Sequence, residues 1–270
     1  MNSTQQVLDV QRVVWSLGDY TRIEHFLRPA SQAVVEACEV RPGMTVLDVG
    51  AGTGNLTLEA AGRGADVIAS DLTPSMIERG KARSRSAGLD ITWHEADAQN
   101  LPFEDNTFDV VASVFAAMFA PDADGVVREM LRVTKPGGMV ALTSWAEEGY
   151  TGQTLDLARR YAPPPPEGTD TPVSWGNEDL ARMRFEKHAA SVDVLRKAIT
   201  WKFDSTEEAR SFLENEAPPI VAAKMAMPPE RFAEMLDETE KLQERYNRGE
   251  GGRVVVDSDY LVVLGRKASG

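Results

Sequence analysis

Short apolar runs alternate with segments of helical periodicity along the first half of this chain. The runs with the length of strands are residues 45–49, 65–71, 91–94, 107–114 and 139–145. Between most of them, apolar residues recur at every third or fourth position, as on the buried face of a helix. Strands and helices that alternate in this way are typical of a parallel sheet covered on both faces. The pattern therefore predicts an α/β domain.

The segments that flank this core follow other patterns. Residues 4–40 predict helices that break at residues 17–19, and Pro29 predicts the start of a new helix at residues 30–38. Residues 147–172 predict a loop, because they contain a run of four prolines.

The second half of the chain predicts fewer strands. Residues 191–203 alternate as a strand does, and residues 253–267 predict a final strand. Residues 205–247, between the two, predict three helices.

Composition limits the functions open to the chain. Of its 270 residues, 42% are hydrophobic, which suffices for one large α/β domain or one domain with a lid. The net charge of −13 argues against binding nucleic acid or anionic membranes. The single cysteine, Cys38, excludes an internal disulfide, and no segment resembles a signal peptide or a membrane span, so we expect a cytoplasmic protein. The three histidines are not grouped at ligand spacings, so we expect no metal site.

The turn after the first predicted strand carries the main chemical signal. Gly50, Gly52 and Gly54 follow Asp48 at alternate positions, and glycines let a backbone turn sharply and approach a ligand closely. A dinucleotide fingerprint would need glycine where Asn55 stands, and the lysine of a phosphate loop is missing. An acid at the strand end favours a cationic ligand without phosphate. S-adenosylmethionine (SAM) has a sulfonium, an ammonium and no phosphate, so the turn predicts a SAM site.

Two later strands also end in acids. Asp71 follows the glycines by about 20 residues, where a carboxylate in a Rossmann-like sheet accepts both ribose hydroxyls. Because Thr73 and Pro74 supply a helix start, we expect Asp71 to be free for the ligand. Asp97 and Ala98 close the third strand, where the carboxylate and the following amide are placed to bind adenine.

Together these motifs resemble the class I SAM-dependent methyltransferases, and most closely the type 11, ubiquinone/menaquinone-biosynthesis-like branch. The resemblance rests on DVGAGTG from Asp48 to Gly54, on the acids above, and on the sequences LPFEDNTFDVV and LRVTKPGG, over residues 40–145. It implies a Rossmann-like, seven-stranded, mostly parallel sheet with an antiparallel last strand, a helical N-terminal leader and a helical lid insertion before the last strand.

The resemblance also implies which residues bind the cofactor. It places the glycine turn under the methionine part of SAM, the end of the second strand at the ribose and adenine, the end of the third beside the adenine, and the end of the fourth against the ligand. The expected cofactor-binding residues are Asp48, Gly50, Ala51, Gly52, Asp71, Leu72, Asp97, Ala98 and Val114. Many relatives are polar where Val114 stands, so from it we expect at most a main-chain contact.

The expected organisation has four parts. They are a helical leader or cap at residues 1–40, a SAM-binding core at residues 41–203, a helical lid insertion at residues 204–250 and the last strand of the core at residues 251–270. The insertion is far longer than an ordinary hairpin loop, and we expect it to cover the acceptor site at the carboxyl edge of the sheet. Trp15 and Tyr20 are candidates either to cover the cofactor or for simple packing.

Further apolar residues are candidates for a pocket wall, or alternatively for core packing. They are Phe115, Met118 and Phe119 after the fourth strand, and Trp175, Met183, Phe212, Met225 and Met227 in the second half of the chain.

The expected reaction is in-line transfer of a methyl group from SAM to an O, N or C nucleophile of a small molecule. Because the sulfonium is already activated, the enzyme mainly positions two reactants and excludes water. His25, Glu147, Tyr150 and Asp156 are candidates for a proton acceptor, but the pattern favours a solvated or capping role for each, so no catalytic residue is assigned.

Two other functions compete with this prediction. One is a nicotinamide-dependent oxidoreductase, against which Asn55 counts, and the other is a SAM-binding module without catalysis. We expect a monomer or homodimer whose partner is a small-molecule acceptor, with no nucleic acid and no membrane.

Overall fold

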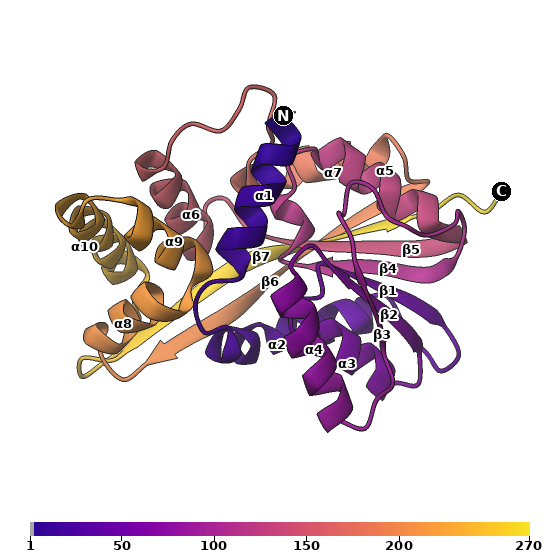
Figure 1. Ribbon diagram of the computed structural model, residues 1–270, viewed down its shortest axis with the longest axis horizontal. Helices are drawn as coiled ribbons and strands as arrows, with labels where there is room; N and C mark the ends of the chain where they lie inside the picture. The colour runs from indigo at the N-terminus through magenta and orange to yellow at the C-terminus, as the bar shows by residue number, and fades with distance from the viewer. Residues whose placement is uncertain (1–2) are drawn as a thin grey trace.

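A seven-stranded sheet in the order β3-β2-β1-β4-β5-β7-β6 organises residues 3–270, the part of the chain that the computed structural model describes (Figure 1). Its strands are β1 (Thr45–Val49), β2 (Asp66–Asp71), β3 (Thr92–Glu95), β4 (Phe108–Val114), β5 (Thr134–Trp145), β6 (Ser191–Phe203) and β7 (Val254–Arg266). Neighbouring strands are parallel, except that β7 is antiparallel to both β5 and β6. The predicted mostly parallel sheet with an antiparallel last strand is confirmed.

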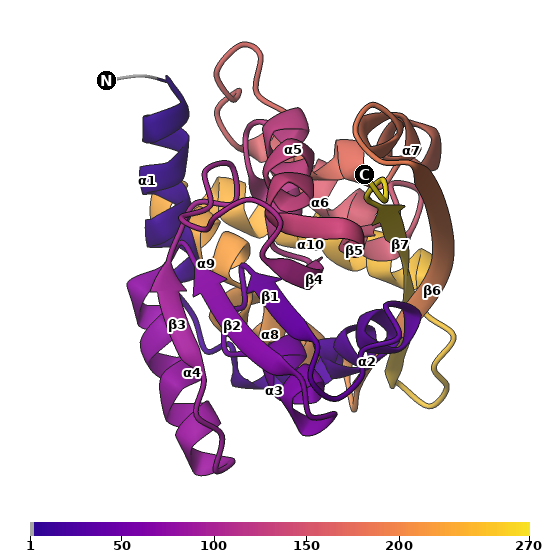
Figure 2. The same cartoon turned by 90° about the vertical axis from the view of Figure 1, so that its right-hand side faces the viewer.

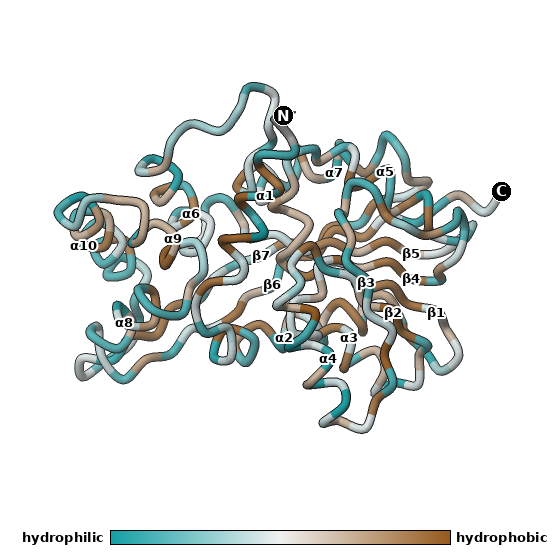
Figure 3. Tube along the Cα trace, in the orientation of Figure 1, coloured by the Kyte–Doolittle hydropathy of each residue, from teal (hydrophilic) through white to brown (hydrophobic). Residues whose placement is uncertain are grey.

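Helices lie on both faces of this sheet and at one end of it. They are α1 (Ser3–Trp15), α2 (Thr21–Ala37), α3 (Asn55–Gly62), α4 (Pro74–Ser86), α5 (Ala123–Val133), α6 (Tyr150–Tyr161), α7 (Glu178–Glu186), α8 (Thr206–Glu216), α9 (Pro218–Ala226) and α10 (Pro229–Tyr246), with short 3-10 turns η1 (Ala117–Phe119) and η2 (Pro172–Trp175). Figure 2 shows α2, α3 and α4 on one face and α5 and α7 on the other. The hydrophobic stretches concentrate in the strands between them (Figure 3).

The three helices α8, α9 and α10 form the predicted helical insertion between β6 and β7. Figure 1 shows them at one end of the molecule, reached by the long strands β6 and β7. Arg22 of α2 donates to Glu208 at 2.8 Å and to Glu216 at 3.0 Å, both on α8. These bonds tie the insertion to the N-terminal leader.

The break predicted at residues 17–19 is present, whereas the new helix predicted after Pro29 is not. Gly18 has a φ of 72°, and α1 ends and α2 begins on either side of it. Pro29 lies inside a continuous α2, on its exposed side. The buried residues Ile23, Leu27 and Ala30 continue across the proline, so burial of this face outweighs the loss of one backbone hydrogen bond.

The loop predicted at residues 147–172 is also wrong, because α6 lies within it. Gly152 and two threonines weaken the helical signal there. Tyr150, Thr154 and Leu157 are nevertheless buried, and α6 packs against α10 and β7. Contacts with segments about a hundred residues later thus stabilise a helix that its own sequence only weakly favours.

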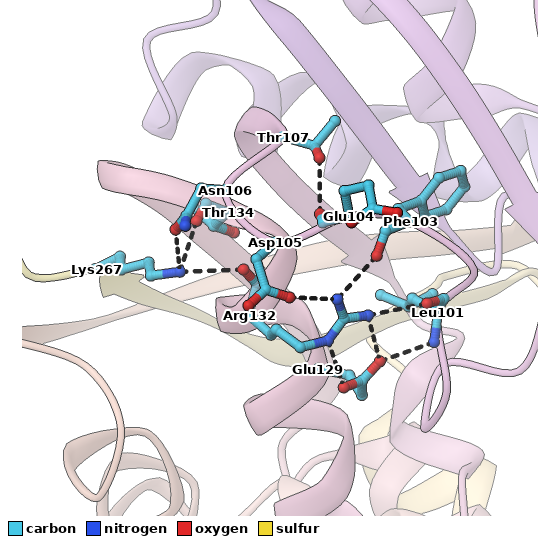
Figure 4. Close-up of polar contacts among 10 residues, drawn as sticks. All are labelled: Leu101, Phe103, Glu104, Asp105, Asn106, Thr107, Glu129, Arg132, Thr134 and Lys267. Atoms are coloured by element: carbon cyan, nitrogen blue, oxygen red, sulfur yellow. Dashed lines mark hydrogen bonds and ion pairs between the residues drawn. The ribbon is translucent and has the colours of Figure 1, made fainter.

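One arginine joins the LPFEDNT and LRVTKPGG sequences (Figure 4). Arg132 on α5 donates to both carboxylate oxygens of Glu129 at 2.8 Å, and to Asp105 Oδ1 at 2.7 Å. It also donates to the carbonyl oxygens of Phe103 at 2.8 Å and Leu101 at 2.9 Å. These residues fix the loop before β4 onto α5, so this part of the family resemblance serves structure rather than chemistry.

A lysine that directly follows the last strand also binds this cluster. Lys267 Nζ donates to Asn106 Oδ1 at 2.8 Å and to the carbonyl oxygens of Arg132 and Thr134 at 3.1 and 2.8 Å. Thr134 already belongs to β5, so this strand begins five residues before the predicted run at residues 139–145, and its pairing with β4 shifts register in this first part.

Arg132→Ala is expected to lower the free energy of unfolding by about 2–3 kcal/mol, because it removes several charge-assisted hydrogen bonds at once. Arg128→Ala on the same helix is the matched control, since within residues 3–270 Arg128 forms only an exposed ion pair, with Asp124 at 3.8 Å. Urea denaturation of both variants tests the difference. Equal losses in the two variants would show that the cluster does not hold the loop.

Candidate active site

A cavity lies at the carboxyl ends of β1, β2 and β4, under the leader helices α1 and α2. Its volume is about 1020 Å³, counting the solvent space at its mouth, which is large enough for a cofactor-sized ligand. All nine residues predicted to bind the cofactor line it: Asp48, Gly50, Ala51, Gly52, Asp71, Leu72, Asp97, Ala98 and Val114. We call this space the strand-end cavity.

Three glycines shape the turn after β1. Gly50, Gly52 and Gly54 have φ angles of 69°, 56° and 91°, in the left-handed region that strains other residues. A Cβ on Gly50 would overlap the side chain of Ala116, which follows β4. A Cβ on Gly52 would meet no atom of the described chain within 4 Å. Gly50 is therefore required by close packing, whereas Gly52 borders the open cavity.

Asp71 at the end of β2 makes more hydrogen bonds to the protein than the sequence predicts. Its Oδ2 accepts a hydrogen bond from the Gly52 amide at 2.8 Å, and its Oδ1 accepts one from the Thr73 amide at 2.8 Å. The predicted helix start is present, with Thr73 as N-cap and Pro74 as the first helical residue, but Asp71 is not left free of protein contacts, because it also binds the backbone where α4 begins. A carboxylate has about four acceptor positions, so capacity for a ligand remains. Burial raises the pKa of Asp71, while these amide bonds lower it.

Asp48 joins β1 to the start of α3. Its Oδ2 accepts hydrogen bonds from the amide and the hydroxyl of Thr57 at 2.9 and 2.6 Å. Only 2% of the residue is exposed. Burial raises the pKa of Asp48 to about 7, against the lowering by Thr57, and the neighbouring Asp71 raises it further. The free protein thus holds a proton at the strand end up to near-neutral pH.

Asp48 is expected to make folding less favourable as the pH rises from about 4 to about 7. In this range the folded protein keeps the Asp48 proton, whereas the unfolded chain, whose pKa is near 3.8, releases it. The contribution of Asp48 to the free energy of unfolding therefore falls by at most about 1.4 kcal/mol per pH unit, and it levels off above pH 7.

Asp48→Asn removes this titration with little change of shape. Relative to wild type, the variant should gain stability between pH 4 and pH 7 in urea titrations at several pH values. A difference in stability that does not change with pH would contradict the raised pKa.

The end of β3 also differs from expectation in one respect. The amide of Gln99 donates to Asp97 Oδ1 at 3.0 Å, and Gln99 Nε2 donates to both Asp97 oxygens at 3.0 and 3.1 Å. A ligand must therefore share Asp97 with Gln99. Ala98, Leu72 and Val114 are half-buried and face the same cavity.

The leader supplies lining residues that sequence reasoning largely missed. They are Leu8, Gln11 and Trp15 from α1, Tyr20 from the connecting turn, and Leu27 and Ser31 from α2. Ser31 is fully buried, and its Oγ has no hydrogen-bond partner in the described part of the chain. Its signal is present in the sequence, because it is the polar member of an apolar stripe with Val34, Val35 and Cys38.

Polar side chains tie α2 to the glycine turn. Thr53 Oγ1 donates to a carboxylate oxygen of Glu24, and Asn55 Nδ2 donates to the Glu24 carbonyl at 2.6 Å. Arg83 of α4 donates to Asn55 Oδ1 at 2.8 Å. Burial, Asp71 and Glu24 all raise the pKa of Tyr20, which therefore keeps its proton beside the acids. The leader is thus part of the cavity wall.

A second cavity, which we call the aromatic cavity, adjoins the first. Its lining residues are Trp15, Tyr20, Ile23, Leu27, Phe115, Phe119, Trp145, Tyr150, Thr151, Leu155, Trp201, Phe203, Ala209, Phe212, Leu213, Ala217, Pro218, Pro219 and Gln243. Of the residues predicted as a pocket wall, Phe115, Phe119 and Phe212 line this cavity, whereas Met118 and Trp175 are buried in the core and Met183 and Met225 are exposed.

The four candidate proton acceptors have different surroundings. Tyr150 lines the aromatic cavity. His25 is exposed on α2, Glu147 is exposed and accepts from Asn177 at 2.8 Å, and Asp156 pairs with Arg159 at 2.8 Å. The last three line neither cavity. In residues 3–270 no group of His, Cys, Asp and Glu is arranged to hold a metal ion. None of the helices described there is long and apolar enough to cross a membrane.

The fold and the strand-end cavity define an α/β protein with a ligand-sized cavity at the carboxyl ends of its parallel strands, and comparison with known proteins gives its class. Residues 47–142 match the model of a methyltransferase domain family. An uncharacterized protein of Mycobacterium tuberculosis is 37% identical over 260 residues, covering 95% of this chain and 93% of the relative. The ubiquinone/menaquinone biosynthesis C-methyltransferase UbiE of Idiomarina loihiensis is 37% identical over 118 residues, or 42% of this chain and 47% of the relative.

Solved structures show the same fold. The YcgJ protein of Bacillus subtilis superimposes with a TM-score of 0.64 at 19% identity, covering 89% of this chain and 99% of that one. The present chain thus contains a methyltransferase domain, has the fold of the class I SAM-dependent methyltransferases, and is similar to UbiE over part of its length. It is a methyltransferase whose cofactor is SAM.

Proposed function

We propose that the strand-end cavity binds SAM through the nine predicted residues, and that the methyl group passes to a small molecule held in the aromatic cavity. The observation that carries this proposal is the wall that the two cavities share. Trp15, Tyr20, Leu27, Phe115 and Phe119 line both. A donor and an acceptor in adjoining cavities meet without crossing bulk water, which favours transfer over hydrolysis.

The residues of the strand-end cavity fit SAM in two independent ways. The space beyond Gly52 contains no protein atom within reach of a Cβ, so a ligand can lie directly against the backbone. The buried Ser31 hydroxyl lacks a protein partner, and a polar group of a bound ligand would satisfy it.

Each acid then has a role suited to its position. The free acceptor capacity of Asp71 serves the ribose hydroxyls, while Asp97 and Ala98 flank the adenine. Asp48 lies at the glycine turn, where the positive charge of the methionine end favours loss of the proton that Asp48 holds in the free protein, and the resulting carboxylate stabilises that charge. Leu72 and Val114 supply apolar walls or main-chain contacts on either side.

The reaction needs little chemical catalysis from the side chains of the protein. SAM supplies a methyl group activated by its sulfonium. An electron pair of the acceptor forms the new bond to the methyl carbon while the carbon–sulfur bond breaks. The two electrons of the broken bond remain on sulfur, and S-adenosylhomocysteine is released. A proton on the attacking atom passes to water at the cavity mouth. The side chains therefore orient two ligands and exclude water, and no catalytic base is assigned.

The leader and the insertion complete the enclosure in this proposal. The leader acts as a cap that covers SAM with Trp15 and Tyr20, and the insertion acts as a lid that covers the acceptor with Phe212 and Gln243. We also propose a cytoplasmic monomer or homodimer, which the single cysteine supports through its fit to a reducing compartment.

Calorimetric titration with SAM, S-adenosylhomocysteine and NAD tests the cofactor assignment. SAM and S-adenosylhomocysteine should bind, and NAD should not. A survey of phenolic, amine and carboxylate acceptors, followed by release of S-adenosylhomocysteine, then tests catalysis. Binding of NAD alone would support the oxidoreductase alternative, and SAM binding without turnover of any acceptor would support a binding module.

A further inference from the structure

The aromatic cavity is free of formal charge. None of its lining residues is Asp, Glu, His, Lys or Arg, although Asp, Glu, Lys and Arg make up 26% of the chain. Burying a charged group without a partner costs several kcal/mol, so a charged acceptor has no compensation there. The lining therefore selects for an uncharged molecule.

The same cavity presents flat aromatic walls. Nine of the chain's 19 aromatic residues line it. Phe115 and Trp145 stack with ring centroids 3.9 Å apart and an angle of 8° between their planes, and Trp201 lies 6.2 Å from Trp145. Rings prefer offset or edge contacts with other rings, so walls of this kind favour a flat, largely apolar ligand.

Phe115 is held in an unusual conformation between the two cavities. Its φ is 53°, a left-handed value that is costly for a bulky side chain. Its amide donates to Thr143 Oγ1 at 2.9 Å, which keeps the backbone in this shape. Strain retained at a wall common to both cavities indicates a functional position for the ring rather than ordinary packing.

One polar pair interrupts the apolar lining. Gln243 Nε2 of α10 lies 3.5 Å from the Tyr150 hydroxyl of α6, and the two residues are only 6% and 7% exposed. No hydrogen bond within residues 3–270 uses the Tyr150 O–H as donor or the Gln243 carbonyl oxygen as acceptor. Thr151 and Trp201, by contrast, are both paired with Ser258, at 2.7 and 2.9 Å.

This pair has one donor and one acceptor to offer a ligand. Burial raises the pKa of Tyr150, so the phenol keeps its proton and donates instead of acting as a base. A hydroxyl or carbonyl group on an otherwise apolar molecule would satisfy both partners.

From this geometry we infer that the methyl acceptor is an uncharged, largely apolar molecule with a flat ring, anchored by one polar group to Tyr150 and Gln243. The inference rests on the proposed function, because it takes the aromatic cavity as the acceptor site. It adds the substrate class and two residues that determine specificity, both outside the SAM-binding motifs. The anchor is built jointly by α6 and by the insertion.

Two probes of equal ring size test the substrate class. 2-Naphthol is uncharged at pH 7, whereas 2-naphthoate carries a carboxylate. In calorimetry on the full chain saturated with S-adenosylhomocysteine, 2-naphthol should bind at least about tenfold more tightly than 2-naphthoate. Equal or tighter binding of 2-naphthoate would overturn the inference, and so would a failure of 2-naphthol to bind.

Variants of the anchor test its two residues. Tyr150→Phe and Gln243→Leu should each weaken 2-naphthol binding by about 3- to 10-fold, because each removes one hydrogen-bonding group. Gln32→Leu, at an exposed position of α2, is the matched control and should change nothing. Unchanged 2-naphthol affinity in both anchor variants would show that the pair does not hold the ligand.

SAM affinity, measured on every variant, separates this inference from the function on which it rests. It should remain at the wild-type value in all three, which also shows that they are folded. If the wild-type protein does not bind SAM, the proposed function fails. If the wild-type protein binds SAM but binds 2-naphthol and 2-naphthoate equally well, only the proposed substrate class fails.

Discussion

Gly52→Val is expected to weaken SAM binding by about 100-fold or more, the largest effect anticipated for a single substitution in this protein. A Cβ at this position points into space that no described protein atom occupies within 4 Å, so the new side chain would fill the volume proposed for the ligand. The substitution also places valine at a φ of 56°, which costs about 1–2 kcal/mol of stability. SAM titration and urea denaturation measure the two effects separately.

Gly43→Val separates ligand exclusion from backbone strain. Gly43 has a φ of 80°, and a Cβ there would also meet no atom within 4 Å, but it lies in the turn before β1 and away from the cavity. This control should lose similar stability while keeping its SAM affinity. Wild-type SAM affinity in Gly52→Val would show that the cofactor does not lie against this turn.

Asp71→Ala is expected to weaken SAM binding by about 1–3 kcal/mol, or roughly 5- to 150-fold. The carboxylate proposed for the ribose is lost. Removing it also leaves the Gly52 and Thr73 amides without their acceptor, so the free energy of unfolding should fall by a similar amount. This loss of stability follows from the structure and not from the sequence, which suggested that Asp71 serves the ligand alone.

Asp66→Ala is the matched control, because Asp66 begins the same strand, is exposed and lies outside the cavity. It should leave both SAM affinity and stability near wild type. If Asp71→Ala loses stability but binds SAM as tightly as the control does, Asp71 shapes the turn without touching the ribose.

The nine residues that the family resemblance implies line one cavity, and their placement at one edge of the sheet followed from the sequence because it depends on local and regular features. Asp48 and Asp71 end apolar runs, and parallel strands bring their carboxyl ends to one edge of a sheet. The alternate glycines report the turn between β1 and α3, since each adopts a left-handed φ. A residue that directly follows a parallel strand lies at the carboxyl edge of the sheet, so its position in the fold follows almost entirely from its position in the sequence.

The predictions that the structure contradicts share a different cause. Helix α6 forms because Tyr150 and Leu157 pack on distant segments, and α2 continues past Pro29 because its buried face does. Hydrogen bonds of Asp71 to Gly52 and of Asp97 to Gln99 depend on backbone positions that residue identity does not specify. Local propensity is weaker than packing at each of these places.

By itself, the sequence determined the order of the strands along the chain, the glycine turn after the first strand and the resemblance to methyltransferases, because all three depend on residues that are neighbours in the chain. Only the tertiary structure decided the aromatic cavity and its polar anchor. The residues around this cavity come from four separate parts of the chain: Trp15 from the leader, Phe115 from the end of β4, Tyr150 from α6 and Gln243 from the insertion. Nothing in their local sequences relates them. They meet because separate elements bury their apolar faces against one another, and that burial leaves a space enclosed by all of them.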